Sequence, residues 1–116
     1  MLVDQKILIA LINDLGAEAY QTLISIFIEE VSETVEKIKK ALDDNDYSTL
    51  SLNVHSMKSV CGTYGAVEAF ELSKDLNDRF KAGEHINTLE DDVKKLINIL
   101  EATIKEFKQI EANGLM

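Results

Sequence analysis

One segment of the chain combines a reactive side chain with small neighbours. His55 is followed by Lys58 three residues later, and Ser51, Ser59 and Gly62 flank it at helical spacings. Residues three, four and seven apart share one face of a helix, so these side chains would all surround the imidazole. An imidazole can act as a nucleophile, an acid–base group or a metal ligand. The segment is therefore the first candidate for chemistry in this chain.

Helical geometry predicts that His55 faces solvent. An α-helix advances about 100° per residue, and the apolar stripe of this segment is centred between Leu50 and Cys61. His55 points about 130° away from that centre. Leu52, three residues before it, is an apolar side chain on the exposed side of the same helix. We therefore expect an accessible imidazole with a small apolar patch beside it.

Three interpretations of His55 compete at this point. Metal binding is disfavoured because no Cys, His or carboxylate follows at the third or fourth position. Acid–base or nucleophilic catalysis needs a cleft and an orienting carboxylate, and helical periodicity supplies neither. The third interpretation is an exposed histidine without a role. The helical wheel alone favours this last interpretation.

Length and composition limit what the rest of the chain can be. A chain of 116 residues with 46% hydrophobic and 28% charged residues fits one globular domain over residues 1–116. Proline is absent and there are only five glycines, which predicts long uninterrupted helices. No apolar run approaches the about 20 residues that cross a bilayer. The chain begins with Met and ends in a short tail, so we expect a stand-alone protein rather than a domain of a larger one.

Charge and cysteine content restrict the partners and the compartment. The formal net charge of −9 argues against nucleic acid as a partner, because phosphate binding needs a basic surface. No secretory signal is recognisable, and the single cysteine cannot form an internal disulfide. We expect a monomeric cytoplasmic protein that does not contact a membrane.

The periodicity of apolar residues predicts five helices and no strand. A short helix over 4–15, with Asp4 as N-cap, precedes a longer one from Ala17 to about Leu42. A third runs from Tyr47 to about Thr63 after Asp46 as N-cap, and a fourth is expected to open at Gly65 and end near Gly83. The last helix is expected to start at Asn87 as N-cap, and residues 112–116 are expected to fray. Short turns between long helices predict an all-α, antiparallel up-down four-helix bundle with a short additional N-terminal helix.

The histidine segment resembles the phosphoacceptor motif of histidine-containing phosphotransfer (HPt) domains. His55, Lys58, Gly65 and Ala66 match the family's His, Lys and Gly-Ala at their spacing, while Met57 stands in for a leucine. Ser59 replaces the family's glycine, but it remains a small residue, as in some stand-alone phosphorelay proteins. Phe27-Ile28-Glu29-Glu30 is similar to the Phe-Leu-Glu-Asp of the family's second helix. The resemblance covers nearly the whole chain.

The resemblance assigns roles to these residues. His55 would accept a phosphoryl group from the aspartate of a receiver domain, and Lys58 would attract the phosphoryl oxygens. Ser59 and Gly62 would leave clearance. Gly65, at the start of the adjoining helix, would let that backbone pass near the imidazole, and Gly62 would do the same from the histidine helix. The alternative for both glycines is that each simply ends a helix.

Two further residues on the fourth predicted helix enter through the resemblance. Family members often carry Glu or Gln at the place of Asn77, bonded to the second imidazole nitrogen. Asn is shorter, which leaves that contact open. Lys81 would extend the positive rim towards the phosphate.

The partners that the resemblance implies are response-regulator receiver domains and a hybrid sensor histidine kinase. Leu52 would form part of the docking patch, and the receiver would contribute Mg²⁺. The chain has no Gly-rich nucleotide loop, so we expect a phosphoryl carrier without cofactor, ATP binding or kinase activity of its own. A kinase dimerisation helix is set aside, because Ser56 follows the histidine and no proline exists. The alternative is a helical interaction domain that binds receivers or kinases without carrying phosphate; a metal-binding bundle is more distant.

Overall fold

The computed structural model of the chain describes residues 1–114, and these residues contain helices and turns but no strand. The prediction of an all-α fold is confirmed. The elements, in chain order, are α1 (Gln5–Leu15), the 3₁₀ turn η1 (Ala17–Ala19), α2 (Tyr20–Asp43), α3 (Tyr47–Tyr64), α4 (Val67–Lys81) and α5 (Ile86–Asn113).

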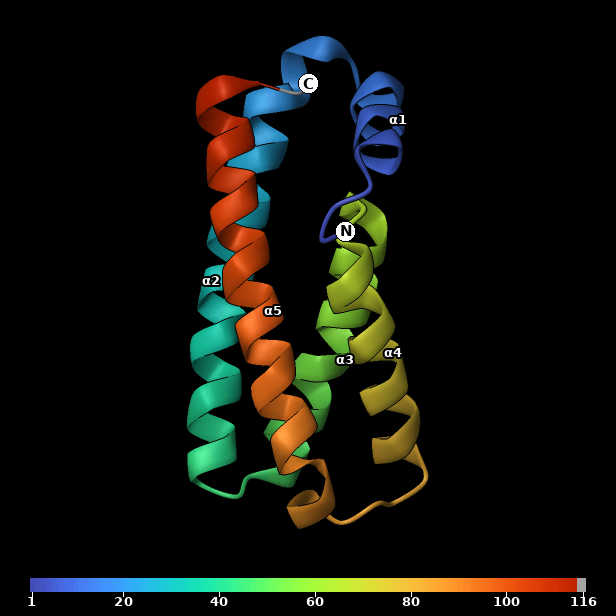
Figure 1. Cartoon of the computed structure of the whole chain (residues 1–116), viewed down its shortest axis with the longest axis vertical. Helices are drawn as coiled ribbons and strands as arrows, with labels where there is room; N and C mark the ends of the chain where they lie inside the picture. Colours follow the sequence, from blue (N-terminus) through green and yellow to red (C-terminus); the bar gives the residue numbers. More distant parts are fainter. Residues whose placement is uncertain (115–116) are drawn as a thin grey trace.

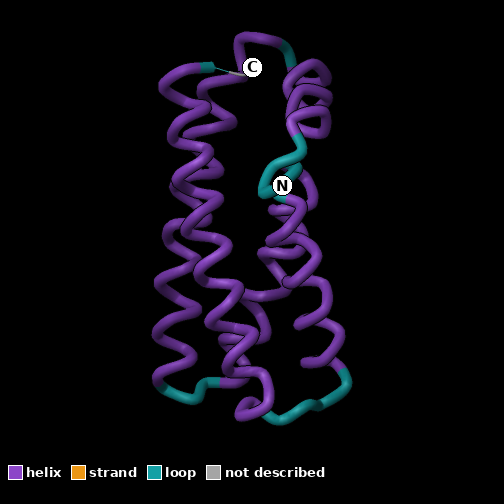
Figure 2. Tube along the Cα trace, viewed as in Figure 1, coloured by secondary structure: helices purple, strands orange, loops and turns teal. Residues whose placement is uncertain are grey.

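The four long helices run up and down along one axis (Figure 1). α2 and α5 pack side by side over their length, and α3 and α4 pair with each other beside the lower part of these two helices. The connections between the elements are short (Figure 2). The resulting molecule measures 43 × 22 × 21 Å, which is the shape of an elongated bundle.

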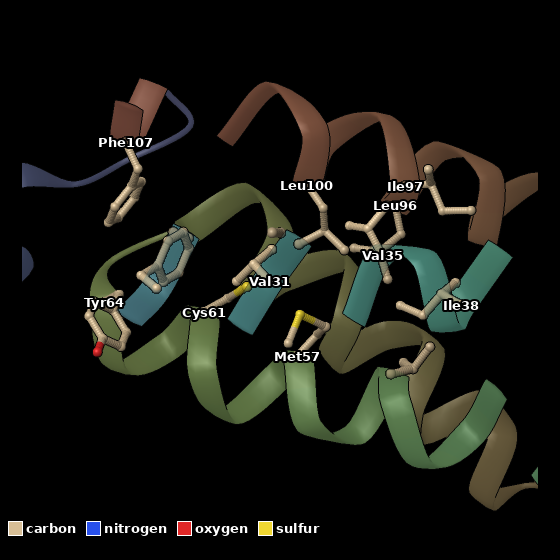
Figure 3. Close-up of a cluster of buried hydrophobic side chains, with 14 of the residues drawn as sticks. Val31, Val35, Ile38, Met57, Cys61, Tyr64, Leu96, Ile97, Leu100 and Phe107 are labelled. Atoms are coloured by element: carbon tan, nitrogen blue, oxygen red, sulfur yellow. The ribbon is translucent and has the colours of Figure 1, made fainter. Parts of the chain in front are cut away.

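The core lies along the bundle axis and is built from the predicted apolar stripes. Figure 3 shows side chains of α2, α3 and α5 that meet there, among them Val31, Met57 and Leu100, all fully buried. The Phe27 and Phe107 rings stack with centroids 3.9 Å apart. A contiguous apolar core of this kind fixes the rotation of each helix, and so determines which residues remain on its outer face.

The ends of the helices agree with two predicted caps and correct a third. Asp4 and Asp46 are N-caps, as predicted, and their carboxylates accept from the backbone N–H groups of Lys6 and Thr49. These two bonds also satisfy backbone donors that have no partner within the helix. Asn87 is not the cap of α5, because the helix begins one residue earlier, at Ile86, after His85.

The prediction that Gly65 opens the fourth helix is wrong. Gly65 is the C-cap of α3, with a left-handed φ of +77°, and α4 begins only at Val67. Glycine adopts this conformation without the steric cost of a Cβ atom, which is why helices often end at one. Its N–H donates back to the Cys61 carbonyl and closes the helix.

α1 packs against the end of α3 through the backbone of this glycine. The N–H of Asp4 donates to the Gly65 carbonyl at 2.8 Å. A Cβ atom on Gly65 would lie 2.7 Å from the Asp4 carbonyl oxygen and 3.0 Å from the Ile7 Cβ. α1 therefore depends on a residue without a side chain at this position.

Two further expectations concern the outer limits of the fold. α5 continues through Asn113 and ends at Gly114, so the predicted fraying from residue 112 is wrong for residues 112–113, whereas Leu115 and Met116 lie outside the described residues. Within residues 1–114, no single helix has the length and hydropathy of a membrane span. Only α1 together with Ala17–Asp43 reaches those values, across a bend of 116°.

Candidate functional site

His55 lies in the middle of α3 on the outer face, exposed as the helical wheel predicted. Figure 3 shows the opposite face of the same helix, where Met57 and Cys61 point into the core. Both of these side chains are fully buried. The anchoring of α3 through its inner face keeps the imidazole outside.

Asn77 of α4 contacts the imidazole. Its Oδ1 atom lies 3.2 Å from Nδ1 of His55. The Asn77 side chain is only 2% exposed, so the amide is held between the helices. The hydrogen bond between Asn77 and the imidazole, which the short side chain of asparagine left undecided in the sequence, is therefore formed.

The alignment of α3 with α4 explains why asparagine is long enough. Seven residues after His55, Gly62 faces Phe70 of α4, which is seven residues before Asn77. A Cβ atom on Gly62 would lie 3.0 Å from the Phe70 ring. The two helices are thus closely packed where the glycine makes room, and this brings the α4 backbone near enough for a short amide to reach His55. Gly62 serves this packing rather than simple clearance around the imidazole.

The contact with Asn77 determines which imidazole nitrogen is free. An amide oxygen carries no hydrogen, so Nδ1 of His55 must be the donor in this bond. In the neutral ring the proton then resides on Nδ1, and Nε2 keeps its lone pair. Because the ring is exposed, that lone pair is available to an incoming electrophile.

Lys58 is the only charged residue in the 18 residues of α3. It is half-buried and forms no ion pair within the described part of the chain. The chain as a whole has 12 basic and 21 acidic residues, so this face contrasts with the rest of the surface. A single ammonium group on a face without carboxylates of its own can attract an anion without local competition.

The remaining predicted site residues of α3 lie around His55 as the spacing required. Ser59 is exposed and Ser51 is half-buried, so neither side chain covers the ring. Leu52 is 66% exposed, which is the highest exposure of a large apolar side chain within residues 1–114 after that of Met1. The side of α3 that carries the histidine is therefore open, with one apolar side chain available for contact.

Gly65 is placed differently from expectation, and Lys81 lies at the edge of the predicted site. Gly65 does not let a helix approach His55, because its backbone is packed against the start of α1. Lys81 is exposed at the last position of α4, one turn beyond Asn77. In the antiparallel alignment this turn lies level with Ser51, so Lys81 and Lys58 lie on opposite sides of His55 along the helix axis.

Other reactive groups in the chain are poor alternatives to His55. Burial raises the pKa of the Cys61 thiol to about 12, so the thiolate nucleophile is absent at neutral pH. Burial, and then the nearby Glu30 carboxylate, raise the pKa of Tyr64. No group of three or more His, Cys, Asp or Glu side chains within residues 1–114 is arranged to hold a metal ion.

Comparison with known proteins gives consistent matches. A family model described as "Hpt domain" matches residues 22–109, which is more than half of the chain. The phosphorelay protein LuxU of Vibrio vulnificus, in two strains, is 27% identical over 117 residues that cover 97% of each chain.

Two solved structures share the fold. The HPT domain of a sensor hybrid histidine kinase from Shewanella superposes with a TM-score of 0.83 at 20% identity, covering 96% of this chain and 94% of that one. The histidine-containing phosphotransfer protein B of Pseudomonas aeruginosa superposes with a TM-score of 0.84 at 22% identity, covering 96% and 95%.

Proposed function

The chain belongs to the Hpt domain family, whose activity is histidine phosphotransfer in phosphorelay signalling, and we propose that His55 is the residue that carries the phosphoryl group. The observation that carries this proposal is the exposed imidazole whose Nδ1 is held by Asn77 Oδ1 at 3.2 Å. It leaves Nε2 as the only imidazole nitrogen of His55 with a free lone pair.

The transfer step follows from this geometry. Nε2 attacks the phosphorus of a receiver's aspartyl phosphate; the N–P bond forms as the bond between phosphorus and the aspartate oxygen breaks. The bonding pair leaves with the receiver's carboxylate, and the proton on Nδ1 stays in place. The ring then carries a positive charge that the Asn77 oxygen stabilises. Onward transfer to a second receiver reverses these bond changes.

Lys58 has an electrostatic role in this proposal. The phosphoryl group passes through a transition state with negative charge on its three equatorial oxygens. The ammonium group of Lys58, one helical turn from His55, attracts and positions these oxygens. Lys81 contributes a second, more distant positive charge at the end of α4.

The partners in the proposal are receiver domains and a hybrid sensor histidine kinase. The receiver supplies the acidic pocket and Mg²⁺, and this chain supplies neither nucleotide binding nor kinase activity. Leu52 belongs to the docking surface beside the histidine. We further propose that the protein acts in the cytoplasm as a monomer, for which sedimentation at several concentrations is the direct test.

The function is tested by phosphoryl transfer from two donors. Wild type and His55→Gln are each incubated with a phosphorylated receiver domain and, separately, with phosphoramidate as a small donor. We expect wild type to acquire an acid-labile phosphate from both donors and His55→Gln to remain unlabelled. His85→Gln is the matched control, because it removes the only other histidine and should label like wild type. Equal labelling of wild type and His55→Gln would contradict the proposal.

A further inference from the structure

Two polar groups beside the site are buried without a hydrogen-bond partner. They are the Oγ atom of Ser73 and the Nδ2 atom of Asn77. Ser73 is fully buried and Asn77 is 2% exposed, so exposed solvent does not compensate either group. A buried polar group without a partner costs about 1–3 kcal/mol, which makes two of them on one helix notable.

Ser73 differs from other hydroxyl residues in the helices of this chain. Thr34, Thr63 and Thr103 each donate to the carbonyl four residues earlier, at 2.7–3.0 Å. This is the common way in which a helical hydroxyl is satisfied. The Ser73 hydroxyl forms no such bond, although the Ala69 carbonyl stands four residues before it.

The position of Ser73 relative to Asn77 suggests the missing partner. The two residues are four apart in α4, so they lie one above the other on the same helix face. Side chains in a helix lean towards its N-terminus, and that of Asn77 therefore leans towards Ser73. A rotation of the Ser73 side chain about χ1, or one bridging water, would join Ser73 Oγ to Asn77 Nδ2.

We infer that Ser73 is a positioning residue for His55. Its hydroxyl oxygen accepts from Asn77 Nδ2, and its hydroxyl proton is donated to the Ala69 carbonyl, as in the three threonines. Because its own proton is donated to Ala69, the Ser73 oxygen can only accept a hydrogen bond from Asn77. It therefore holds Nδ2 of the amide towards Ser73 and Oδ1 towards His55.

The orientation of the amide decides whether His55 can react. With Oδ1 towards the ring, Nδ1 holds the proton and Nε2 is the nucleophile. With the amide reversed, Nδ2 would donate to Nδ1, and the proton of the neutral ring would reside on Nε2. Ser73 thus acts on the reaction through the tautomer of His55, without contacting the phosphoryl group. The inference rests on the proposed function of His55.

The tautomer can be measured directly by ¹⁵N NMR of the imidazole nitrogens. The spectra are recorded at the alkaline end of a pH series, where the ¹⁵N shifts no longer change with pH and only the neutral ring is observed. We expect Ser73→Ala to lower the ratio of the Nδ1–H to the Nε2–H form of His55 about fivefold, which corresponds to the loss of one ordinary hydrogen bond. Ser73→Thr keeps the hydroxyl and should restore the wild-type ratio.

Thr103→Val is the matched control, because it removes a fully buried helix hydroxyl from α5. It should leave the tautomer ratio of His55 unchanged. An unchanged ratio in Ser73→Ala overturns the inference, and so does an equal fall in Thr103→Val, since the effect would then come from general loosening of the bundle.

Phosphorylation by phosphoramidate separates the inference from the function on which it rests. If Ser73 positions the amide, Ser73→Ala should take up phosphate more slowly than wild type, in proportion to the lower fraction of its Nδ1–H form and by at most about fivefold. An altered ratio with no phosphorylation of His55 even in wild type would support the orienting role of Ser73 and refute the proposed function. An unaltered ratio with normal phosphorylation of wild type would refute the role of Ser73 alone.

Discussion

The two histidines of this chain are both exposed, yet their rings are held in opposite ways. Nδ1 of His55 donates to a side-chain oxygen, that of Asn77, at 3.2 Å. Nδ1 of His85 accepts from the backbone N–H of Asn87, also at 3.2 Å, and so caps the start of α5. The proton of the neutral ring therefore resides on Nδ1 in His55 and on Nε2 in His85.

The difference shows that exposure alone does not make a histidine a nucleophile. Nδ1 of His85 uses its lone pair to accept the capping hydrogen bond, and Nε2 carries the proton of the neutral ring. Neither nitrogen of His85 therefore has a free lone pair. His55 has a free lone pair on the nitrogen that points away from Asn77. The partner of Nδ1, and not the solvent accessibility of the ring, distinguishes the two residues.

The largest expected effect concerns which atom is phosphorylated. Because only Nε2 of His55 is free, wild type should carry its phosphate on that nitrogen, and His85 should remain essentially unlabelled. Peptide mapping of labelled protein locates the residue, and ³¹P NMR identifies the isomer. Phosphate on Nδ1 of His55, or comparable labelling of His85, would contradict the comparison.

Removal of the Asn77 amide should leave Nδ1 of His55 without its hydrogen-bond partner. Asn77→Ala deletes a hydrogen bond to a ring that becomes charged, an interaction of about 1.5–3 kcal/mol, so phosphorylation should slow about tenfold or more. Initial rates with phosphoramidate measure this. Asn77→Gln keeps an amide oxygen one methylene further out and should lose less. Equal rates in Asn77→Ala and wild type would show that the contact is incidental.

Lys58 beside His55 forms no ion pair within residues 1–114, whereas Arg79 near the cap of α5 is paired with Glu84 and Asp92. The charge of Lys58 can therefore be removed by itself. Lys58→Met keeps the length of the side chain, and at a half-exposed position the lost interaction is about 1 kcal/mol, or about fivefold in rate. Lys58→Arg should retain most of the rate. The effect in wild type should diminish as salt is raised, because the charge is partly open to solvent. A Lys58→Met variant as fast as wild type at low salt would exclude the electrostatic role.

The smallest effect is expected from the cap histidine, and it should appear in stability rather than in transfer. His85→Ala removes the side chain that accepts from Asn87 N–H and should lower the free energy of unfolding by about 1 kcal/mol. Urea denaturation measures this loss. His85→Asn restores a capping acceptor and should recover most of the stability. Phosphorylation of the folded protein should be the same in all three forms, and a slower His85→Ala would break the separation between the two histidines.

Much of the fold could be predicted from the spacing of apolar residues. The rotation of α3, and with it the exposure of His55, was predicted from the apolar stripe of this helix. The stripe comprises Leu50, Val54, Met57 and Cys61. The carboxylates of Asp4 and Asp46 marked two helix starts, because a local acceptor near free N–H groups is an almost self-contained feature. These features depend on neighbours within one turn.

The predictions from sequence were wrong where a residue's role depends on distant parts of the chain. Gly65 was expected near His55 because the family motif was taken to place it at the start of the adjoining helix, but its position is determined by its packing against Asp4, 61 residues earlier. Asn87 matched a capping pattern, yet α5 starts one residue earlier and His85 provides the acceptor. A pattern of residue types does not specify the path that the backbone takes between two helices.

The sequence by itself determined that His55 is an exposed imidazole with Lys58 on the next turn, because helical periodicity alone relates these residues to the buried stripe. Only the tertiary structure decided which nitrogen is free. That depends on Asn77, 22 residues away on another helix, and on the close packing of Gly62 against Phe70 that lets a short amide reach Nδ1. Hydrogen-bond reach varies over tenths of an ångström, and spacing in the sequence does not specify the separation of two helices at that scale.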